Sequence, residues 1–142
     1  MLRCPVCEKT DMVVLELQGI EIDYCLKCGG IWLDSGELEL LMGSAQKKEE
    51  IMASFSDAQK NCDEKKRPCP VCEKAMKKMS VRIDGSSVLL DECSRKHGIW
   101  FDKGELYQII NCASKDGKEK DPVLAFLSDI FCGNNRKKEN DK

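Results

Sequence analysis

Ten cysteines and one histidine are the side chains of this sequence best suited to chemistry. Near the start of the chain, four of the cysteines form two Cys-x2-Cys pairs, Cys4 with Cys7 and Cys25 with Cys28. Two cysteines separated by two residues can bind one ion from a single tight turn, and two such turns complete the tetrahedral shell that zinc prefers. The paired spacing therefore predicts a four-thiolate zinc site.

A second set of the same kind follows in the chain but ends differently. Cys69 and Cys72 form one pair and Cys93 begins the other, but alignment with the first set places Lys96 where the fourth cysteine should stand. The next residue is His97, the single histidine of the chain. An imidazole reaches further than a thiolate, so a shift of one residue can still bring a ring nitrogen to the metal. We therefore expect a Cys3His site; without His97 the ion would keep an open position, and a catalytic role would then have to be considered.

Disulfides and free buried thiols are the alternative interpretations of these cysteines. A disulfide framework is typical of secreted proteins, whereas the chain starts directly in a motif, without an apolar signal segment. The sequence has no uninterrupted run of about 18 apolar residues, which is the length needed to span a membrane. We therefore expect a cytoplasmic protein whose paired cysteines hold metal. Three further cysteines have no partner at a chelating interval and are interpreted as incidental thiols: Cys62, Cys112 and Cys132.

The segments that must position the ligands occur twice in the chain. The hexapeptide CPVCEK at Cys4–Lys9 returns at Cys69–Lys74, and the sequence GIWLDSGEL that begins at Gly30 returns as GIWFDKGEL from Gly98. Two copies that share both ends and their order indicate one module used twice.

Each copy contains a predicted β-hairpin between its cysteine pairs. Apolar and polar residues alternate there with the period of a half-buried strand, and Gly-containing turns separate the two runs. The predicted strands are Met12–Leu17 and Ile20–Tyr24 in the first copy, and Met79–Ile83 and Val88–Leu90 in the second.

A short helix is expected after the tryptophan of each copy. Asp34 and Asp102 are the expected N-caps, and Glu37 and Glu105 follow three residues later, which is the spacing of a capping box. The apolar residues beyond them fall on one helical face. We expect the tryptophans to pack against the hairpin beside the metal, with ligand stacking on exposed indoles as the alternative: Trp32 and Trp100.

The order Cys-Pro-x-Cys, hairpin, Cys-x2-Cys-Gly-Gly-Ile-Trp-Leu-Asp-x-Gly-Glu-Leu resembles the bacterial TFIIB-type zinc-ribbon proteins, labelled transcription factor zinc-finger domain. The resemblance covers Cys4 to about Met42 and Cys69 to about Ile110. A fold transfers with such a resemblance more securely than a function, since members of this family largely lack an assigned activity. The resemblance implies one zinc ion on each of two ligand sets: Cys4, Cys7, Cys25 and Cys28, and Cys69, Cys72, Cys93 and His97.

The sequence thus predicts a small, zinc-dependent α+β fold of two tandem zinc ribbons, each a β-hairpin plus a short helix. Because each ribbon is too small to bury a sufficient core, zinc binding, worth about 10–16 kcal/mol at neutral pH, should drive its folding. The predicted segments are ribbon 1 at 1–43, a helical linker at 44–68, ribbon 2 at 69–112, a flexible linker at 113–120, an apolar C-terminal helix at 121–133 and a disordered tail at 134–142.

Charge distinguishes the functions that such a protein could have. Residues 1–43 hold three cations against eight carboxylates, a net charge of −5 that repels nucleic-acid phosphates. We therefore favour a protein-interaction or scaffold module in a transcription-related assembly, with an unknown protein partner or self-association through 121–133. Direct nucleic-acid binding by a transcription regulator is the alternative, because ribbon 2 could form a basic patch from Lys74, Lys77, Lys78, Arg82, Arg95 and Lys96.

A metal-dependent hydrolase or a thiol oxidoreductase is the second alternative. Zinc sites with four protein ligands have no vacancy for water, and the chain has no second histidine for acid–base work. We therefore expect two structural zinc ions per chain and no catalytic residue. Membrane attachment is not expected either, because the apolar helix at 121–133 carries no Lys or Arg.

Overall fold

The computed structural model describes residues 2–43, 47–58, 66–83 and 85–113. The predicted C-terminal helix at 121–133 and tail at 134–142 lie outside the described residues, as do the predicted flexible linker beyond residue 113, Cys62 and Cys132. The elements are β1 (Val13–Leu17), β2 (Ile20–Tyr24), β3 (Ile31–Asp34), α1 (Glu37–Met42), α2 (Lys48–Ala53), β4 (Ser56–Asp57), β5 (Lys77–Ile83), β6 (Ser86–Glu92), β7 (Gly98–Phe101) and α3 (Glu105–Ala113).

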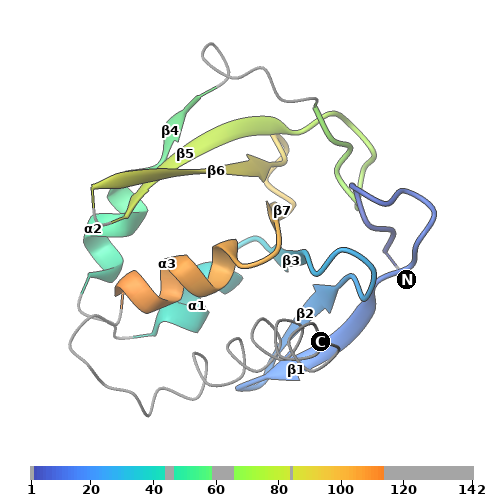
Figure 1. Ribbon diagram of the computed structural model, residues 1–142, viewed down its shortest axis with the longest axis horizontal. Coiled ribbons are helices and arrows are strands. Elements are labelled where there is room, and N and C mark those ends of the chain that lie inside the picture. Colours follow the sequence, from blue (N-terminus) through green and yellow to red (C-terminus); the bar gives the residue numbers. More distant parts are fainter. Residues whose placement is uncertain (1, 44–46, 59–65, 84, 114–142) are drawn as a thin grey trace, which may run out of the picture.

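Both ribbons contribute to a single antiparallel sheet. Its seven strands run in the order β1-β2-β3-β7-β6-β5-β4, so three strands of ribbon 1 are followed by three of ribbon 2 (Figure 1). The hairpin predictions are confirmed as β1–β2 and β5–β6, although β5 begins two residues before the predicted strand and β6 extends beyond it at both ends. The third strand of each ribbon, β3 or β7, was not predicted. These two strands join the ribbons.

The junction between the ribbons pairs the same segment of each repeat with itself. In the β3–β7 register, Trp32 lies opposite Trp100, with Ile31 opposite Phe101 and Leu33 opposite Ile99. This pairing gives the ribbons a local two-fold relationship centred on the tryptophans. Both indoles are 0% exposed. The junction is therefore part of the protein core.

A glycine of each ribbon makes room for the tryptophan of the other. A Cβ atom on Gly30 would lie 2.1 Å from Cζ2 of Trp100, and a Cβ on Gly98 would lie 2.6 Å from Cζ2 of Trp32. Real Cβ atoms do not approach carbon so closely, so any larger residue would force the rings or strands apart. The repeated glycine before Ile-Trp is thus explained by packing between repeats.

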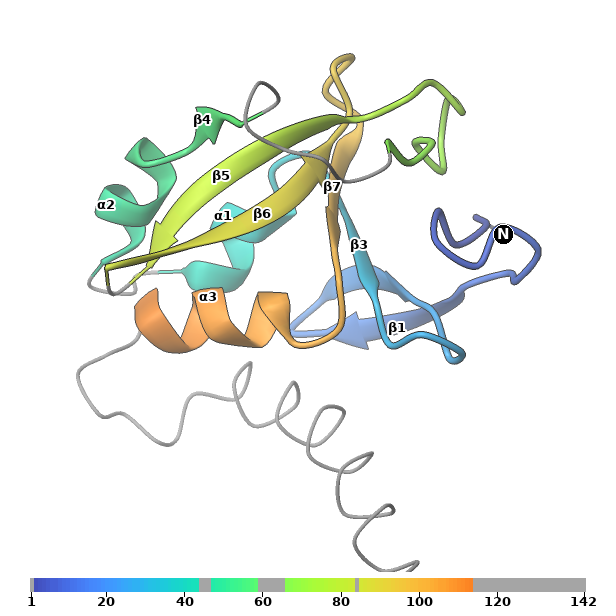
Figure 2. The ribbon, with the colours of Figure 1, turned by 45° about the horizontal axis from the view of Figure 1, so that its top comes forward.

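The helices cover one side of the bent sheet. Figure 2 shows α1 and α3 between the two hairpins, where α1 contacts β2, β3 and α3 while α3 contacts β5. The helices bury the apolar faces that the sequence predicted, and one core cluster takes residues from both ribbons. No helix in the described part of the chain is long and apolar enough to cross a membrane.

The predicted N-cap at Asp34 is wrong. The N-cap of α1 is Gly36, in the left-handed region with φ 88°, and no side chain caps the helix. The Asp34 carboxylate instead accepts a hydrogen bond from Nε1 of Trp32 at 3.0 Å, because a buried indole N–H needs an acceptor. The Glu37 carboxylate does accept from the Asp34 backbone N–H, at 2.9 Å, as in a capping box.

Ribbon 2 repeats this chain of hydrogen bonds. Nε1 of Trp100 donates to Asp102 at 3.0 Å, and the Asp102 backbone N–H donates to Glu105 at 2.9 Å. The Asp102 carboxylate therefore also accepts a hydrogen bond from a buried indole. Burial raises the pKa of Glu105 to about 8, against the hydrogen bond that lowers it. The repeated Trp-x-Asp-x-x-Glu sequence therefore fixes each tryptophan relative to the helix that follows.

The segment that joins the ribbons is helical only in part. It contains α2 and the short strand β4, which pairs with β5 through Ser56 opposite Ser80 and Asp57 opposite Met79. Ile51 of α2 is 2% exposed and belongs to the common core. The described part of the segment is therefore a component of the fold.

We predict that Gly30→Ala lowers the free energy of unfolding by about 1–3 kcal/mol, the usual cost of overpacking a core. The clash is with the six-membered ring of Trp100, so Trp100→Phe should offset part of the loss in the double variant. Denaturant unfolding of the zinc-loaded protein and its three variants measures this coupling. Strict additivity of the two single changes would contradict the proposed contact.

Candidate metal centres

The first metal centre is formed by four cysteines from two loops. Cys4 and Cys7 lie before β1, and Cys25 and Cys28 lie between β2 and β3. Their Sγ atoms all lie within 4.8 Å of one another, with 3.6 Å between Cys4 and Cys28 and 3.8 Å between Cys7 and Cys25. Four sulfurs at 2.3 Å from a tetrahedral zinc ion stand about 3.8 Å apart. The thiols are free, so the geometry fits zinc and contains no disulfide.

Backbone N–H groups point at the sulfurs of this centre. The N–H groups of Val6 and Cys7 donate to Sγ of Cys4 at 3.4 and 3.3 Å, and that of Cys28 donates to Cys25 at 3.5 Å. Glu8, with φ 61°, takes the left-handed conformation that lets the chain turn back after the pair. Such donors stabilise the negative charge of thiolate ligands.

The second centre has three cysteines and the histidine. Cys69, Cys72, Cys93 and His97 also have their ligand atoms within 4.8 Å of one another. Sγ of Cys93 lies 3.7 Å from Sγ of Cys72 and 3.4 Å from Nδ1 of His97. A tetrahedral zinc ion with sulfur at about 2.3 Å and nitrogen at about 2.0 Å would set the last distance near 3.5 Å. These residues therefore fit a second zinc ion, bound through Nδ1.

In each ribbon, the turn that carries the second pair of metal ligands begins and ends at an equivalent residue. The backbone N–H of Cys25 donates to the carbonyl of Gly30 at 3.0 Å, and that of Cys93 donates to the carbonyl of Gly98 at 3.1 Å. The glycines are those that contact the opposite tryptophan. Each turn is thereby joined to the β3–β7 junction.

Within those equal bounds, the turn of ribbon 2 is tighter by one residue. In ribbon 1 the N–H of Gly29 bonds to the carbonyl four residues back, at 2.8 Å, whereas in ribbon 2 the N–H of Lys96 bonds three residues back, at 2.9 Å. Gly29 and Lys96 are the residues that take positive φ, 81° and 67°. Lys96 thus makes the turn, and His97 occupies the ligand position. The one-residue shift is a change in turn geometry.

Hydrogen bonding within the first centre shifts the pKa values of two of its thiols in opposite directions. The bond to Cys28 lowers the pKa of Cys4 to about 5 against the effect of burial, and the same bond raises the pKa of Cys28. In the second centre, burial raises the pKa of Cys69 to about 11. Burial also opposes ionisation of Cys93, but backbone donors outweigh it and lower the pKa to about 6. A bound zinc ion supplies the positive charge that keeps all of these thiols ionised.

One apolar cluster surrounds both centres. It contains Trp32, Trp100, Met12 and Met76 together with the first cysteine of every pair. The tryptophans therefore pack beside the metal ligands, as predicted, and stacking of a ligand on an exposed indole is excluded. Because ligands of both centres belong to one cluster, the centres are parts of a single core.

A network of charges around the buried pair Lys78 on β5 and Asp91 on β6 was not predicted. Lys78 is 2% exposed, and its Nζ lies 2.6 Å from Oδ1 of Asp91. Nη1 of Arg67 lies 3.3 Å from Asp91 and 2.7 Å from Asp102. Lys78 is therefore no part of an accessible basic patch, which corrects the prediction. The sequence contains all of these charged residues, but it does not show that Arg67 of the linker contacts Asp91 and Asp102.

We predict that removing zinc unfolds both ribbons together, because their ligands share one core. Elemental analysis should give two zinc ions per chain, and a strong chelator should abolish the far-UV β signal in one transition. Zinc addition under reducing conditions should restore it. A far-UV spectrum unchanged after demonstrated metal loss would refute the structural role of zinc.

We predict that His97→Ala weakens zinc binding at the second centre selectively. Loss of a direct ligand should cost at least the 10–100-fold in affinity that loss of an outer hydrogen bond to a ligand costs. Competition with a chromogenic chelator measures both affinities, and cobalt absorption distinguishes a Cys4 from a Cys3His centre. Lys96→Gly is the control, because glycine keeps the positive φ of this turn while the lysine side chain is removed, and it should leave the cobalt spectrum unchanged. An effect as large as that of His97→Ala would contradict the assignment.

Comparison with known proteins identifies the repeated unit. The family described as "Transcription factor zinc-finger", with TFIIB-type zinc ribbons, matches residues 3–43 and 68–111, which together make up more than half of the chain. No curated protein and no solved structure gives a significant match. The matched segments contain all eight ligand residues and both tryptophans. The chain is a zinc-binding member of the TFIIB-type zinc-ribbon family, with two tandem copies of the ribbon.

Proposed function

We propose that this protein is a protein-interaction module in a transcription-related assembly, in which the two zinc centres hold exposed loops in place for a protein partner. The observation that carries the proposal is the paired display of one loop, Cys-Pro-Val-Cys-Glu. The two copies lie side by side and line the same cavity. Their central valines, Val6 and Val71, are 39% and 45% exposed although they are apolar. Exposed apolar side chains at matched positions favour contact with protein.

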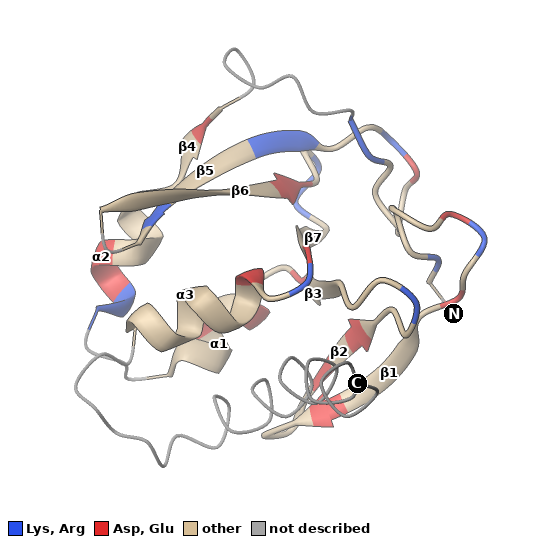
Figure 3. Ribbon diagram, viewed as in Figure 1, with Lys and Arg blue, Asp and Glu red and all other residues tan. Residues whose placement is uncertain are grey.

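The distribution of charge supports a protein partner over nucleic acid. Lys78 of ribbon 2 and Arg67 of the joining segment are held in ion pairs with aspartates. Carboxylates dominate the β1–β2 hairpin of ribbon 1 (Figure 3). Seven thiolates and two zinc ions take the formal charge of the whole chain from −2 to −5. Direct contact with phosphates would need a separate, strongly basic face.

A catalytic role receives no support from the metal centres. Each centre has four protein ligands within tetrahedral distances, which leaves no coordination position for water. Zinc ribbons are typically non-catalytic, and the role proposed for these centres is structural.

The test compares protein and nucleic-acid binding in matched variants. Val6→Asp with Val71→Asp adds charge to both loops, and Val14→Asp is the control, because Val14 is a 50% exposed valine on β1. Each tagged protein is purified from its native cells after nuclease treatment, and bound proteins are identified. We expect a protein retained by the wild type and the control but lost from the double variant, with zinc content unchanged.

The alternative function is direct nucleic-acid binding. Fluorescence anisotropy with duplex DNA, single-stranded DNA and RNA at two salt concentrations measures it. Salt-sensitive binding that the double variant leaves unchanged, with no nuclease-resistant partner, would overturn the proposal in favour of a nucleic-acid binder.

A further inference from the structure

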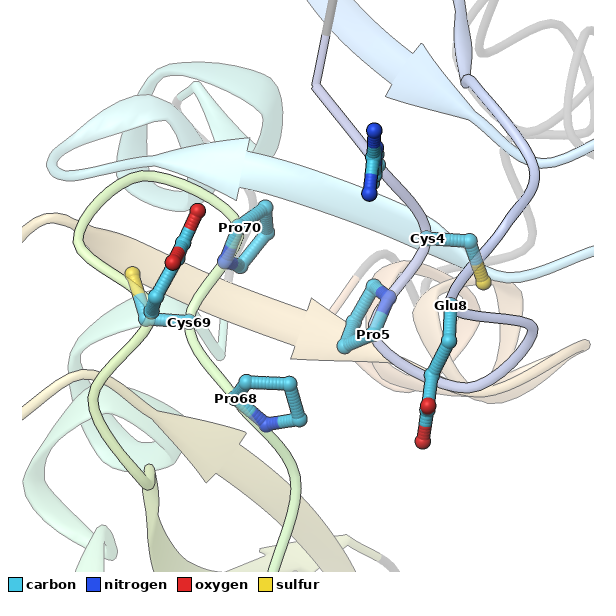
Figure 4. Close-up of a pocket in the computed structure, with 8 residues that line it drawn as sticks. Cys4, Pro5, Glu8, Pro68, Cys69 and Pro70 are labelled. Carbon is cyan, nitrogen blue, oxygen red and sulfur yellow. The ribbon is translucent and has the colours of Figure 1, made fainter.

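A cavity of about 580 Å³ lies between the Cys-Pro loops of the two ribbons. Each ribbon contributes the first cysteine of its first pair, the proline that follows it and the glutamate after the second cysteine. Figure 4 shows Pro5 on one loop facing Pro68 and Pro70 on the other. We call this cavity the knuckle cleft. Its lining outside the metal ligands is Arg3, Pro5, Glu8, Pro68, Pro70 and Glu73.

The knuckle cleft favours a positively charged ligand. Glu8 and Glu73 are exposed carboxylates at equivalent positions of the two loops, and Arg3 is the one cation among the residues that line the cleft. The adjoining zinc centres, with four and three thiolates, carry formal charges of −2 and −1. The summed charge around the cleft is therefore negative, which favours a cation over an anion there.

The cleft also presents rigid apolar surface. The rings of Pro5, Pro68 and Pro70 line it, and the residues that follow Pro5 and Pro70 in the chain are the exposed Val6 and Val71. Lys and Arg side chains pack their aliphatic stems against such surfaces while their charged ends stay with carboxylates. The volume lies within the roughly 300–1,000 Å³ typical of ligand sites, which is enough for a few side chains. These features together match a peptide segment better than a simple ion.

We propose that the knuckle cleft binds an extended segment of a partner protein that places one Lys or Arg side chain between Glu8 and Glu73 and flanking apolar side chains against the prolines and valines. This inference rests on the proposed function, because it specifies which surface contacts the protein partner. Nucleic acid is disfavoured at this place, since its phosphates would approach two carboxylates and two negatively charged metal centres.

The experiment uses a phage-displayed library of random peptides, selected on the full-length, zinc-loaded protein. We expect enriched peptides to share a Lys or Arg beside apolar residues. Synthetic copies of those peptides should bind the double variant Glu8→Gln/Glu73→Gln with an affinity at least tenfold lower than their affinity for the wild-type protein. Glu16→Gln/Glu21→Gln is the control, because it removes two exposed carboxylates from the β1–β2 hairpin and should leave peptide affinity unchanged.

Amide chemical shifts of the labelled protein, titrated with the tightest-binding peptide, locate the site. Changes centred on the two Cys-Pro loops support the inference. Peptides without a basic residue, equal affinity of the two double variants, or no enriched peptide would each overturn it. Enriched peptides that bind at another surface would overturn the assignment of the binding site to the knuckle cleft, while leaving the proposed function in place. Native protein partners that survive nuclease treatment would support that function independently of this selection.

Discussion

The contact between each ribbon's tryptophan and the other ribbon's glycine is the constraint on which the rest of the structure depends. At Gly30 the indole of Trp100 occupies the space of a side chain, and at Gly98 the Leu33 carbonyl oxygen and the indole of Trp32 do so. The contact fixes β3 against β7, and the backbone bonds from Cys25 to Gly30 and from Cys93 to Gly98 fix the metal turns to those strands. The metal centres are therefore placed relative to each other by the same packing that joins the ribbons, and the cleft between their loops exists for that reason.

Joining the ribbons also changes how zinc stabilises the protein. A chain of about forty residues buries too small a fraction of its surface to fold alone, and metal binding ordinarily supplies the missing free energy. Here the helices and hairpins of both ribbons share one apolar core, and a second cluster surrounds both ligand sets. Each ion consequently stabilises a core to which the other also contributes. The two centres should therefore act on one folding equilibrium, since a core shared by both ribbons cannot form from one of them alone.

The sequence predicts what is local and misses what lies between the repeats. Ligand spacing and the two hairpins follow from residues near one another in the chain, so both could be predicted. The run Ile31-Trp32-Leu33 is too short to indicate a strand, and its partner lies in the other repeat. Asp34 was predicted as an N-cap from the capping-box spacing to Glu37, but its carboxylate accepts a hydrogen bond from the buried indole of Trp32 instead. His97 was identified, yet only the tighter turn at Lys96 explains how it reaches the metal position.

The repeats are most alike at their junction and least alike at their outer strands. Arg67 and Lys78 hold Asp91 in ribbon 2, whereas the equivalents of these two basic residues in ribbon 1 are Leu2 and Val14. Strand β4 of the joining segment covers the edge of β5, and among the described residues no strand covers the outer edge of β1. Packing explains the difference, because a substitution at the centre would have to suit both ribbons at once, while one at an edge affects a single ribbon. If a protein partner binds the knuckle cleft, as proposed, it meets a matched pair of zinc loops flanked by two dissimilar surfaces.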